Sequence, residues 1–145
     1  HPEFKLRYEG YCKALQEAGL PLDEQLRVHA KNQETAGYEA VARLLKSGLE
    51  FDGLFAVTDL IAFGALKCLR KSGVKVPQEL SVVGFDDLPA ATYFSPSLTT
   101  IRQDTRLAAE ALVKNLIGLI NGETVQSHQL PLSLKIRGSC GGRRS

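Results

Sequence analysis

Two adjacent aspartates, Asp86 and Asp87, follow a short apolar run near the middle of the sequence. The run from Leu80 to Phe85 has the length and composition of a buried strand. Ligand-contacting groups of α/β sheets gather where strands end, so Asp86 is the first candidate for a binding residue. Its carboxylate would accept hydrogen bonds from ligand hydroxyls or ring N–H groups. The structural alternative is a cap of a turn or of the next helix. We interpret Asp87, which points elsewhere, as a turn or packing residue.

Thr58 and Asp59 stand in a comparable place, between a predicted strand over 51–57 and the helix that follows it. Asp59 is at a natural N-cap position, which favours a structural role for its carboxylate. Thr58 is the neighbouring polar residue and is kept as a candidate for ligand contact.

Sequence patterns typical of enzymes are absent. There is no GxSxG, Walker, HExxH or GxGxxG motif. The cysteines and histidines lack the spacing of a metal site or of a nucleophile–base pair: Cys12, Cys68, Cys140, His1, His29 and His128. We therefore expect that the protein is not an enzyme and that it holds no metal and no cofactor.

The bulk composition is that of one ordinary soluble domain. The chain has 145 residues and a net charge of +2, which implies no strong field toward nucleic acid or membrane. No apolar run approaches the length of a membrane span, and the polar start HPEFK shows no signal peptide. Scattered, odd-numbered cysteines suit a reducing compartment, so we predict a cytoplasmic location.

Hydrophobic periodicity predicts alternating helices and strands. Helices are expected over 5–18, 35–46 (capped by Thr35), 58–71 and 105–120, and strands over 26–30, 51–57, 80–85, 98–101 and 129–136. This alternation predicts an α/β fold with a mostly parallel sheet flanked by helices. Such a unit normally begins with a strand, so we expect at least one strand upstream of the first helix.

Two motifs carry a resemblance to a known family. VVGFDD followed by SPSLTTIRQD is similar to the effector-binding core of the LacI/GalR family, and residues 7–138 follow that pattern without large gaps. The resemblance implies a periplasmic-binding-protein-like type I fold with its N-terminal portion absent. It places 1–102 in the C-terminal subdomain and 103–130 in a crossover and helix of the N-terminal subdomain. A strand over 131–138 then returns, and 139–145 form a flexible tail.

The resemblance also implies site residues. Asp86 matches the family's effector-contacting Asp, and Arg7 in RYEGYCKAL matches an Arg that binds effector hydroxyls or a carboxylate. Thr58 stands where the family usually has Asn. Asn32 stands where some members stack a Trp or Phe on the ligand. Either the ligand differs from theirs, or another aromatic such as Phe94 supplies that wall.

The helix around 60–69, LIAFGALKCL, is apolar over nearly its whole circumference. One face would pack on the sheet and the other needs a second cover. In the family this helix and the nearby SPSL segment form a homodimer interface, while cover from within the same chain is the alternative. The predicted dimer residues are Leu60, Ile61, Phe63, Gly64, Leu66, Lys67, Pro96 and Leu98.

The implied function is the effector-sensing and dimerisation part of a LacI-type transcriptional regulator. A small, sugar-like metabolite would bind between two subdomains and shift their arrangement. Operator DNA would be contacted only through a headpiece that is missing from this sequence, and no membrane partner is expected. The alternative is an exported sugar-binding protein of an ABC-type transporter. The identity of the effector and the sign of regulation stay open.

Overall fold

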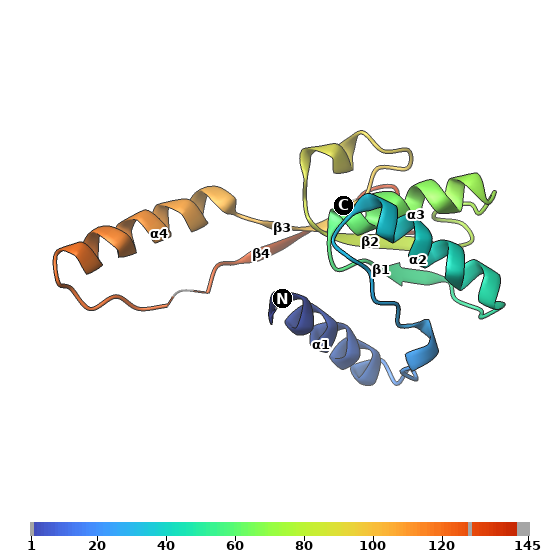
Figure 1. Cartoon of the computed structure of the whole chain (residues 1–145), viewed down its shortest axis with the longest axis horizontal. Coiled ribbons are helices and arrows are strands. Elements are labelled where there is room, and N and C mark those ends of the chain that lie inside the picture. The colour runs from blue at the N-terminus through green and yellow to red at the C-terminus, as the bar shows by residue number, and fades with distance from the viewer. Residues whose placement is uncertain (1, 128, 142–145) are drawn as a thin grey trace.

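A four-stranded sheet is at the centre of the computed structural model, which describes residues 2–127 and 129–141 (Figure 1). Three neighbouring strands are parallel, and the fourth is antiparallel to the third. In sheet order they are β1 (Gly53–Phe55), β2 (Ser81–Asp86), β3 (Thr99–Gln103) and β4 (Leu132–Lys135). The predicted α/β fold with a mostly parallel sheet is confirmed.

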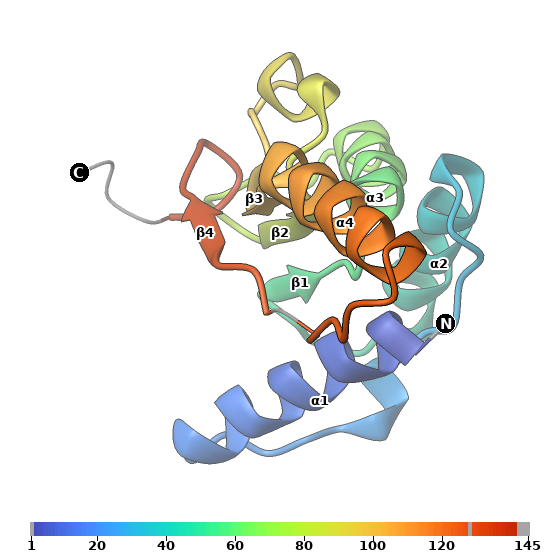
Figure 2. The ribbon, with the colours of Figure 1, turned by 90° about the vertical axis from the view of Figure 1, so that its left-hand side faces the viewer.

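Helices lie over both faces of the sheet (Figure 2). α3 packs on β2, and α2 packs on α3, while α1 lies over the opposite face beside Val83 and Phe85. The α-helices are α1 (Pro2–Glu17), α2 (Glu34–Ser47), α3 (Asp59–Lys71) and α4 (Thr105–Ile120). Two short 3-10 helices cover Glu24–Leu26 and Pro89–Thr92. All four predicted α-helices are present.

α3 is apolar over most of its surface, and two layers of this chain cover most of it. The sheet takes one side and α2 takes the other, so the helix lies inside the hydrophobic core. The core residues are Val41, Ala56, Ala62, Phe63, Ala65, Leu66, Cys68, Leu69, Leu80, Val82, Ala91 and Leu98. The second cover that the sequence demanded for residues 60–69 is therefore supplied within the chain itself.

Two glycines allow α2 and α3 to cross in backbone contact. A Cβ on Gly64 would collide with the Glu34 carbonyl oxygen and the Tyr38 nitrogen of α2. A Cβ on Gly37 would collide with the Ile61 backbone of α3. Because each obstacle is backbone, neither helix can yield by a simple side-chain rotation.

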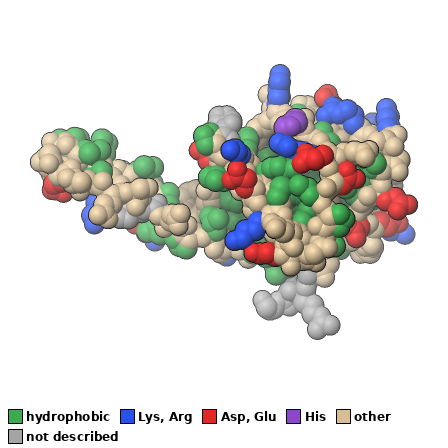
Figure 3. Space-filling view, turned by 90° about the horizontal axis from the view of Figure 1, so that it is seen from below, with side chains coloured by type: hydrophobic (Ala, Val, Ile, Leu, Met, Phe, Trp, Pro, Cys, Tyr) green, Lys and Arg blue, Asp and Glu red, His purple; other side chains and the backbone are tan. Residues whose placement is uncertain are grey.

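α4 and the chain that leads from it to β4 project away from the body (Figure 1). We call the described residues 104–127 and 129–131 the arm. Hydrophobic side chains gather at the tip of the arm in Figure 3. The helix exposes a row of apolar side chains: Leu112, Val113, Leu116, Ile117, Leu119 and Ile120. Asp104 begins the helix by accepting a hydrogen bond from the Leu107 amide at 2.9 Å.

Three local predictions were wrong. Residues 26–30 form no strand: a 3-10 turn ends at Leu26, and the residues after it have no ladder partner among the described strands. Asp59 is not an N-cap, because Thr58 holds that position and accepts a hydrogen bond from the Ile61 amide. Thr35 is not a cap either, since α2 begins at Glu34 after Gln33.

The predicted flexible tail over 139–145 begins too early. Ser139 is fully buried, donates a hydrogen bond to the Val82 carbonyl at 2.6 Å and accepts one from the Thr99 amide at 2.8 Å. It therefore joins the segment after β4 to β2 and β3. Residues 142–145 of that tail, like His128, lie outside the described residues.

We expect Gly64→Ala to lower the free energy of unfolding by roughly 3 kcal/mol, because the new methyl overlaps the α2 backbone. Gly10→Ala is the matched control: nothing lies within 4 Å of a Cβ there, and alanine favours a helix by about 1 kcal/mol over glycine. Urea unfolding followed by circular dichroism measures both. Equal stabilities of the two variants would contradict the close helix crossing.

Candidate functional site

Arg7 and Asp86, two of the predicted ligand-binding residues, form an ion pair. A guanidinium nitrogen of Arg7 lies 3.4 Å from a carboxylate oxygen of Asp86, with 13% and 27% of their side chains exposed. Arg7 also donates a hydrogen bond to the Val57 carbonyl at 2.6 Å, and its guanidinium lies 3.7 Å from the centre of the Phe85 ring. α1 thus brings its arginine to the end of β2 and fixes it on an aromatic platform.

Thr58 and Asn32 form a second pair. The Thr58 hydroxyl donates a hydrogen bond to the Asn32 side-chain oxygen at 2.6 Å. Thr58 directly follows Val57, the residue that Arg7 binds, so the two pairs adjoin through the chain between β1 and α3. We call Arg7, Asn32, Thr58 and Asp86 the candidate site. Thr58 is buried, whereas Asn32 is exposed.

Phe94 is not brought to the candidate site by any described contact. Its ring stacks on Phe63 of α3, with centroids 4.4 Å apart and planes 9° apart, and it packs against the hydrophobic core. The aromatic rings beside the candidate site both contact Arg7: Phe85 of β2, with its ring centre 3.7 Å from the guanidinium, and Phe4 of α1, at 5.6 Å. Nothing in the sequence indicated that Phe85 would contact Arg7, because an apolar residue in a predicted strand is expected in the core.

Burial and charge act together on Asp86. Burial raises the pKa of its carboxyl; the positive charge of Arg7 opposes that shift, and the negative charge of Asp59 adds to it. The Gln103 side-chain amide of β3 donates a further hydrogen bond to Asp86 at 3.1 Å. The site therefore offers several N–H donors around one carboxylate, an arrangement that can recognise a ligand carrying hydroxyl groups.

Asp87 serves a different purpose from its neighbour, as its predicted packing role requires. Its side chain is 3% exposed and pairs with Arg102 of β3 and with Arg137, which follows β4. Burial raises the pKa of Asp87, but hydrogen bonds from Arg137 and Arg102 outweigh that and hold it below its ordinary value. Arg137 also donates to the Leu98 carbonyl at 2.8 Å. Neither arginine was a candidate in the sequence, because isolated basic residues near strands are usually solvated.

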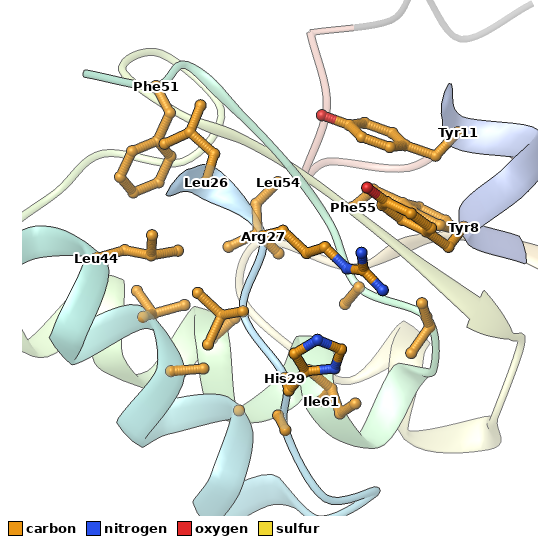
Figure 4. A pocket seen from close by; sticks show the side chains of 18 of the residues that line it. Tyr8, Tyr11, Leu26, Arg27, His29, Leu44, Phe51, Leu54, Phe55 and Ile61 are labelled. Atoms are coloured by element: carbon orange, nitrogen blue, oxygen red, sulfur yellow. The ribbon is translucent and has the colours of Figure 1, made fainter. Parts of the chain in front are cut away.

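Two cavities flank α1. One, of 820 Å³, lies between α1 and the sheet and reaches Arg7 and Gln103. The other, of 390 Å³, lies between α1, residues 22–30, β1 and α2 (Figure 4). Its inner wall is mostly apolar, with Leu26, Leu44 and Leu54 around it in Figure 4, and none of the four candidate-site residues lines it. The first cavity is therefore the one continuous with the candidate site.

An aromatic stack closes one end of the smaller cavity (Figure 4). The Tyr8 and Tyr11 rings are 6.2 Å apart, and Tyr11 lies 6.1 Å from Phe55 of β1. The Arg27 guanidinium covers Tyr8 at 4.2 Å. These contacts fasten α1 to β1 and to the segment before α2, and so help to place Arg7.

The residues predicted for a dimer interface divide into two groups. Phe63, Gly64, Leu66 and Leu98 are buried within this chain, so the structure gives them a core role. Leu60 is 38% exposed, Lys67 is exposed and paired with Glu34, and Ile61 and Pro96 are half-buried. A dimer surface here would have to be built from this second group.

Comparison with known proteins identifies the same fold. A family model described as periplasmic binding protein-like domain matches residues 1–140. The transcriptional regulator MalR of Clostridium butyricum is 36% identical over 135 residues, which cover 92% of this chain and 40% of MalR. The chain therefore spans well under half the length of this relative.

Two solved structures are similar. The complex of the transcriptional regulator CelR with cellobiose has a TM-score of 0.85 and 35% identity, covering 92% of this chain and 41% of CelR. A LacI family regulator from Enterococcus faecium with bound ribose has a TM-score of 0.87 and 28% identity, covering 97% and 53%. The names are those of regulators, not enzymes. Within the described residues no group of His, Cys, Asp or Glu is arranged to hold a metal ion, and no helix is long and apolar enough to cross a membrane.

We expect Asp87→Asn to lower the free energy of unfolding by about 2 kcal/mol at neutral pH. This is less than for a wholly buried pair, because Arg102 is 54% exposed. The folded pKa of Asp87 is lowered, so its contribution is present above the unfolded value of about 3.9 and is lost as the pH falls through the folded value. The difference between variant and wild type should therefore shrink in acid.

Denaturant unfolding over a pH series measures this difference. Asp104→Asn is the control, because asparagine caps a helix about as well as aspartate and stability should hardly change. A wild-type advantage over Asp87→Asn that stays constant into strong acid would contradict the ionic role of Asp87.

Proposed function

The chain belongs to the periplasmic binding protein-like domain family, and on this premise we propose that it is the effector-sensing and dimerisation portion of a LacI-type transcriptional regulator. The effector is a small, sugar-like metabolite. The single observation that carries this proposal is the Arg7–Asp86 pair on the Phe85 ring. It supplies a planar donor and a carboxylate acceptor side by side, beside an aromatic face.

The chemistry of the site favours a polyhydroxylated ligand. Sugars present vicinal hydroxyls, which a carboxylate accepts from and a guanidinium donates to at the same time. Asn32 adds an exposed amide next to Thr58. The bound cellobiose and ribose of the two similar regulators support a sugar class without fixing which sugar this chain binds.

The division of the chain follows the same proposal. Residues 1–102 form the C-terminal subdomain, 103–130 the crossover and helix of the N-terminal subdomain, and 131–138 the strand that returns. The arm's projection and its exposed apolar side chains support this assignment, because such a helix needs a partner to cover it. An effector bound between the subdomains would favour one arrangement of arm and body.

The regulator would act in the cytoplasm on operator DNA, through a headpiece outside residues 1–145. The regulator names of the relatives favour this over the exported sugar-binding protein. A homodimer would place two headpieces on one operator. The exposed Leu60 and Lys67, seven residues apart on α3, and the half-buried Pro96 support a contact surface on the exposed side of α3.

We expect Asp86→Ala, made in the full-length regulator, to abolish the response to sugar while operator binding persists. Loss of a charged acceptor should lower the affinity for the sugar by about tenfold or more. Calorimetric titration with ribose, cellobiose and lactose on the purified regulator finds the ligand, and gel-shift assays follow the operator. Unchanged sugar affinity in the variant would rule out Asp86 as a contact.

We expect Leu60→Glu to shift the regulator from dimer to monomer, because it places a charge in the proposed contact surface. Sedimentation velocity measures the change. Leu20→Glu is the control, since Leu20 is also exposed but lies after α1, far along the chain from that surface. A dimer that survives Leu60→Glu would move the interface elsewhere.

A further inference from the structure

Asp59 is an unusual residue for the first turn of a helix, because it is fully buried. Its side chain does not cap α3; Thr58 does. Instead the carboxylate crosses to the sheet. One oxygen accepts a hydrogen bond from the Thr100 hydroxyl of β3 at 2.6 Å, and the other accepts one from the Leu88 amide at 2.8 Å.

Room for this carboxylate comes from Gly84 of β2. A Cβ on Gly84 would collide with an Asp59 oxygen and would lie 3.0 Å from Leu98. β2 thus has no side chain at Gly84, where the Asp59 carboxylate lies against it. The glycine in VVGFDD is therefore required because the Asp59 carboxylate of α3 occupies the space of a Cβ at Gly84.

The two hydrogen bonds of Asp59 hold a turn of uncommon backbone geometry. Asp86 and Asp87 both have positive φ angles, 121° and 55°, in a region that residues with a Cβ rarely adopt. The Leu88 amide, directly after them, is held by Asp59. The Asp87 amide donates to the Thr100 hydroxyl at 3.4 Å, and that hydroxyl donates to Asp59. Both amides after Asp86 are thus tied, directly or through Thr100, to one buried carboxylate.

We propose that Asp59 is a positioning residue of the candidate site, whose carboxylate holds the turn over 86–88 in the conformation that presents Asp86 to a ligand. This inference rests on the proposed function, in which Asp86 contacts the effector. It gives a role in ligand recognition to a residue that touches no ligand. It also explains why the Asp86 carboxylate faces Arg7 and Gln103 while that of Asp87 turns toward two other arginines.

Charge provides a readout that a merely structural role would not move. The groups that act on the Asp86 carboxyl are Arg7 of α1, Asp59 of α3 and Gln103 of β3, while adjacent Asp87 is paired with its own arginines. The negative charge of Asp59 helps to raise the pKa of Asp86. Removing that charge should therefore lower the pH at which Asp86 titrates.

The test uses the full-length regulator and needs no ligand. The Asp86 side-chain carbon is titrated by NMR, and hydrogen exchange is followed at the Asp87 and Leu88 amides. Asp59→Asn removes the charge and should lower the Asp86 titration midpoint. Thr100→Val keeps the charge and should speed exchange of the Asp87 amide by about tenfold while Leu88 stays protected. Asp59→Ala should expose both amides.

The control is Asp23→Asn, because Asp23 caps the 3-10 helix at Glu24–Leu26 and should leave the Asp86 midpoint unmoved. An Asp86 midpoint that is the same in Asp59→Asn and wild type would overturn the proposal. So would unchanged Asp87 exchange in Thr100→Val. If Asp59→Ala does not fold, these two variants still decide.

The same preparation separates this inference from the proposed function. Ribose, cellobiose and lactose are titrated into the full-length regulator. If none binds, the sugar proposal fails, while the Asp86 midpoint and amide exchange still establish whether Asp59 holds the turn.

Discussion

Three carboxylates, Asp59, Asp86 and Asp87, crowd the end of one strand, and keeping them apart is the constraint on which this part of the molecule depends. Like charges repel in a poorly solvated interior, and the negative charge of Asp59 accordingly helps to raise the pKa of Asp86. Each carboxylate has its own partners: Asp87 has two arginines, Asp86 has Arg7 and Gln103, and Asp59 has an amide and a hydroxyl. The positive φ angles of Asp86 and Asp87 are what send adjacent side chains to different partners. The unusual backbone at Asp86 and Asp87 therefore goes together with the separation of their two charges.

The sequence predicted the helices and the mostly parallel sheet, and the family resemblance named Arg7 and Asp86 as site residues, although a 3-10 helix, α2, β1 and α3 lie between them along the chain. Periodicity was sufficient for the helices because the apolar spacing is a local signal: it marks α2 and α3, which bury an apolar face, and equally α1 and α4, which bury almost none within this chain. It failed for 26–30, since a strand exists only where another strand pairs with it, and no described strand does. It failed at Ser139, because a serine between glycine and cysteine gives no sign of the two hydrogen bonds that bury it.

Other parts of the site could not be read from the sequence because their signals are ambiguous. Asp59 satisfies every local rule for an N-cap, and only the nearness of β3 and of the turn after β2 draws its carboxylate into the core. Arg102 and Arg137 look like solvated residues until Asp87 is seen between them. In the motif VVGFDD, Gly84, Asp86 and Asp87 each contact residues that lie elsewhere in the chain, which the motif alone does not show.

The arm meets the body through the very residues that flank the candidate site. β3 leads into α4 and β4 returns from it, so the β3–β4 ladder is one attachment of the arm. Asp87 joins Arg102 on the first strand to Arg137 just beyond the second, which makes it another. Asp86 and Asp87 are adjacent, and both have positive φ angles, which residues with a Cβ rarely adopt. The two aspartates and the ion pairs of Asp87 with Arg102 and Arg137 thus form a continuous series of contacts from the candidate site to the base of the arm. This is a short, physically continuous route by which ligand contact and arm position would be linked.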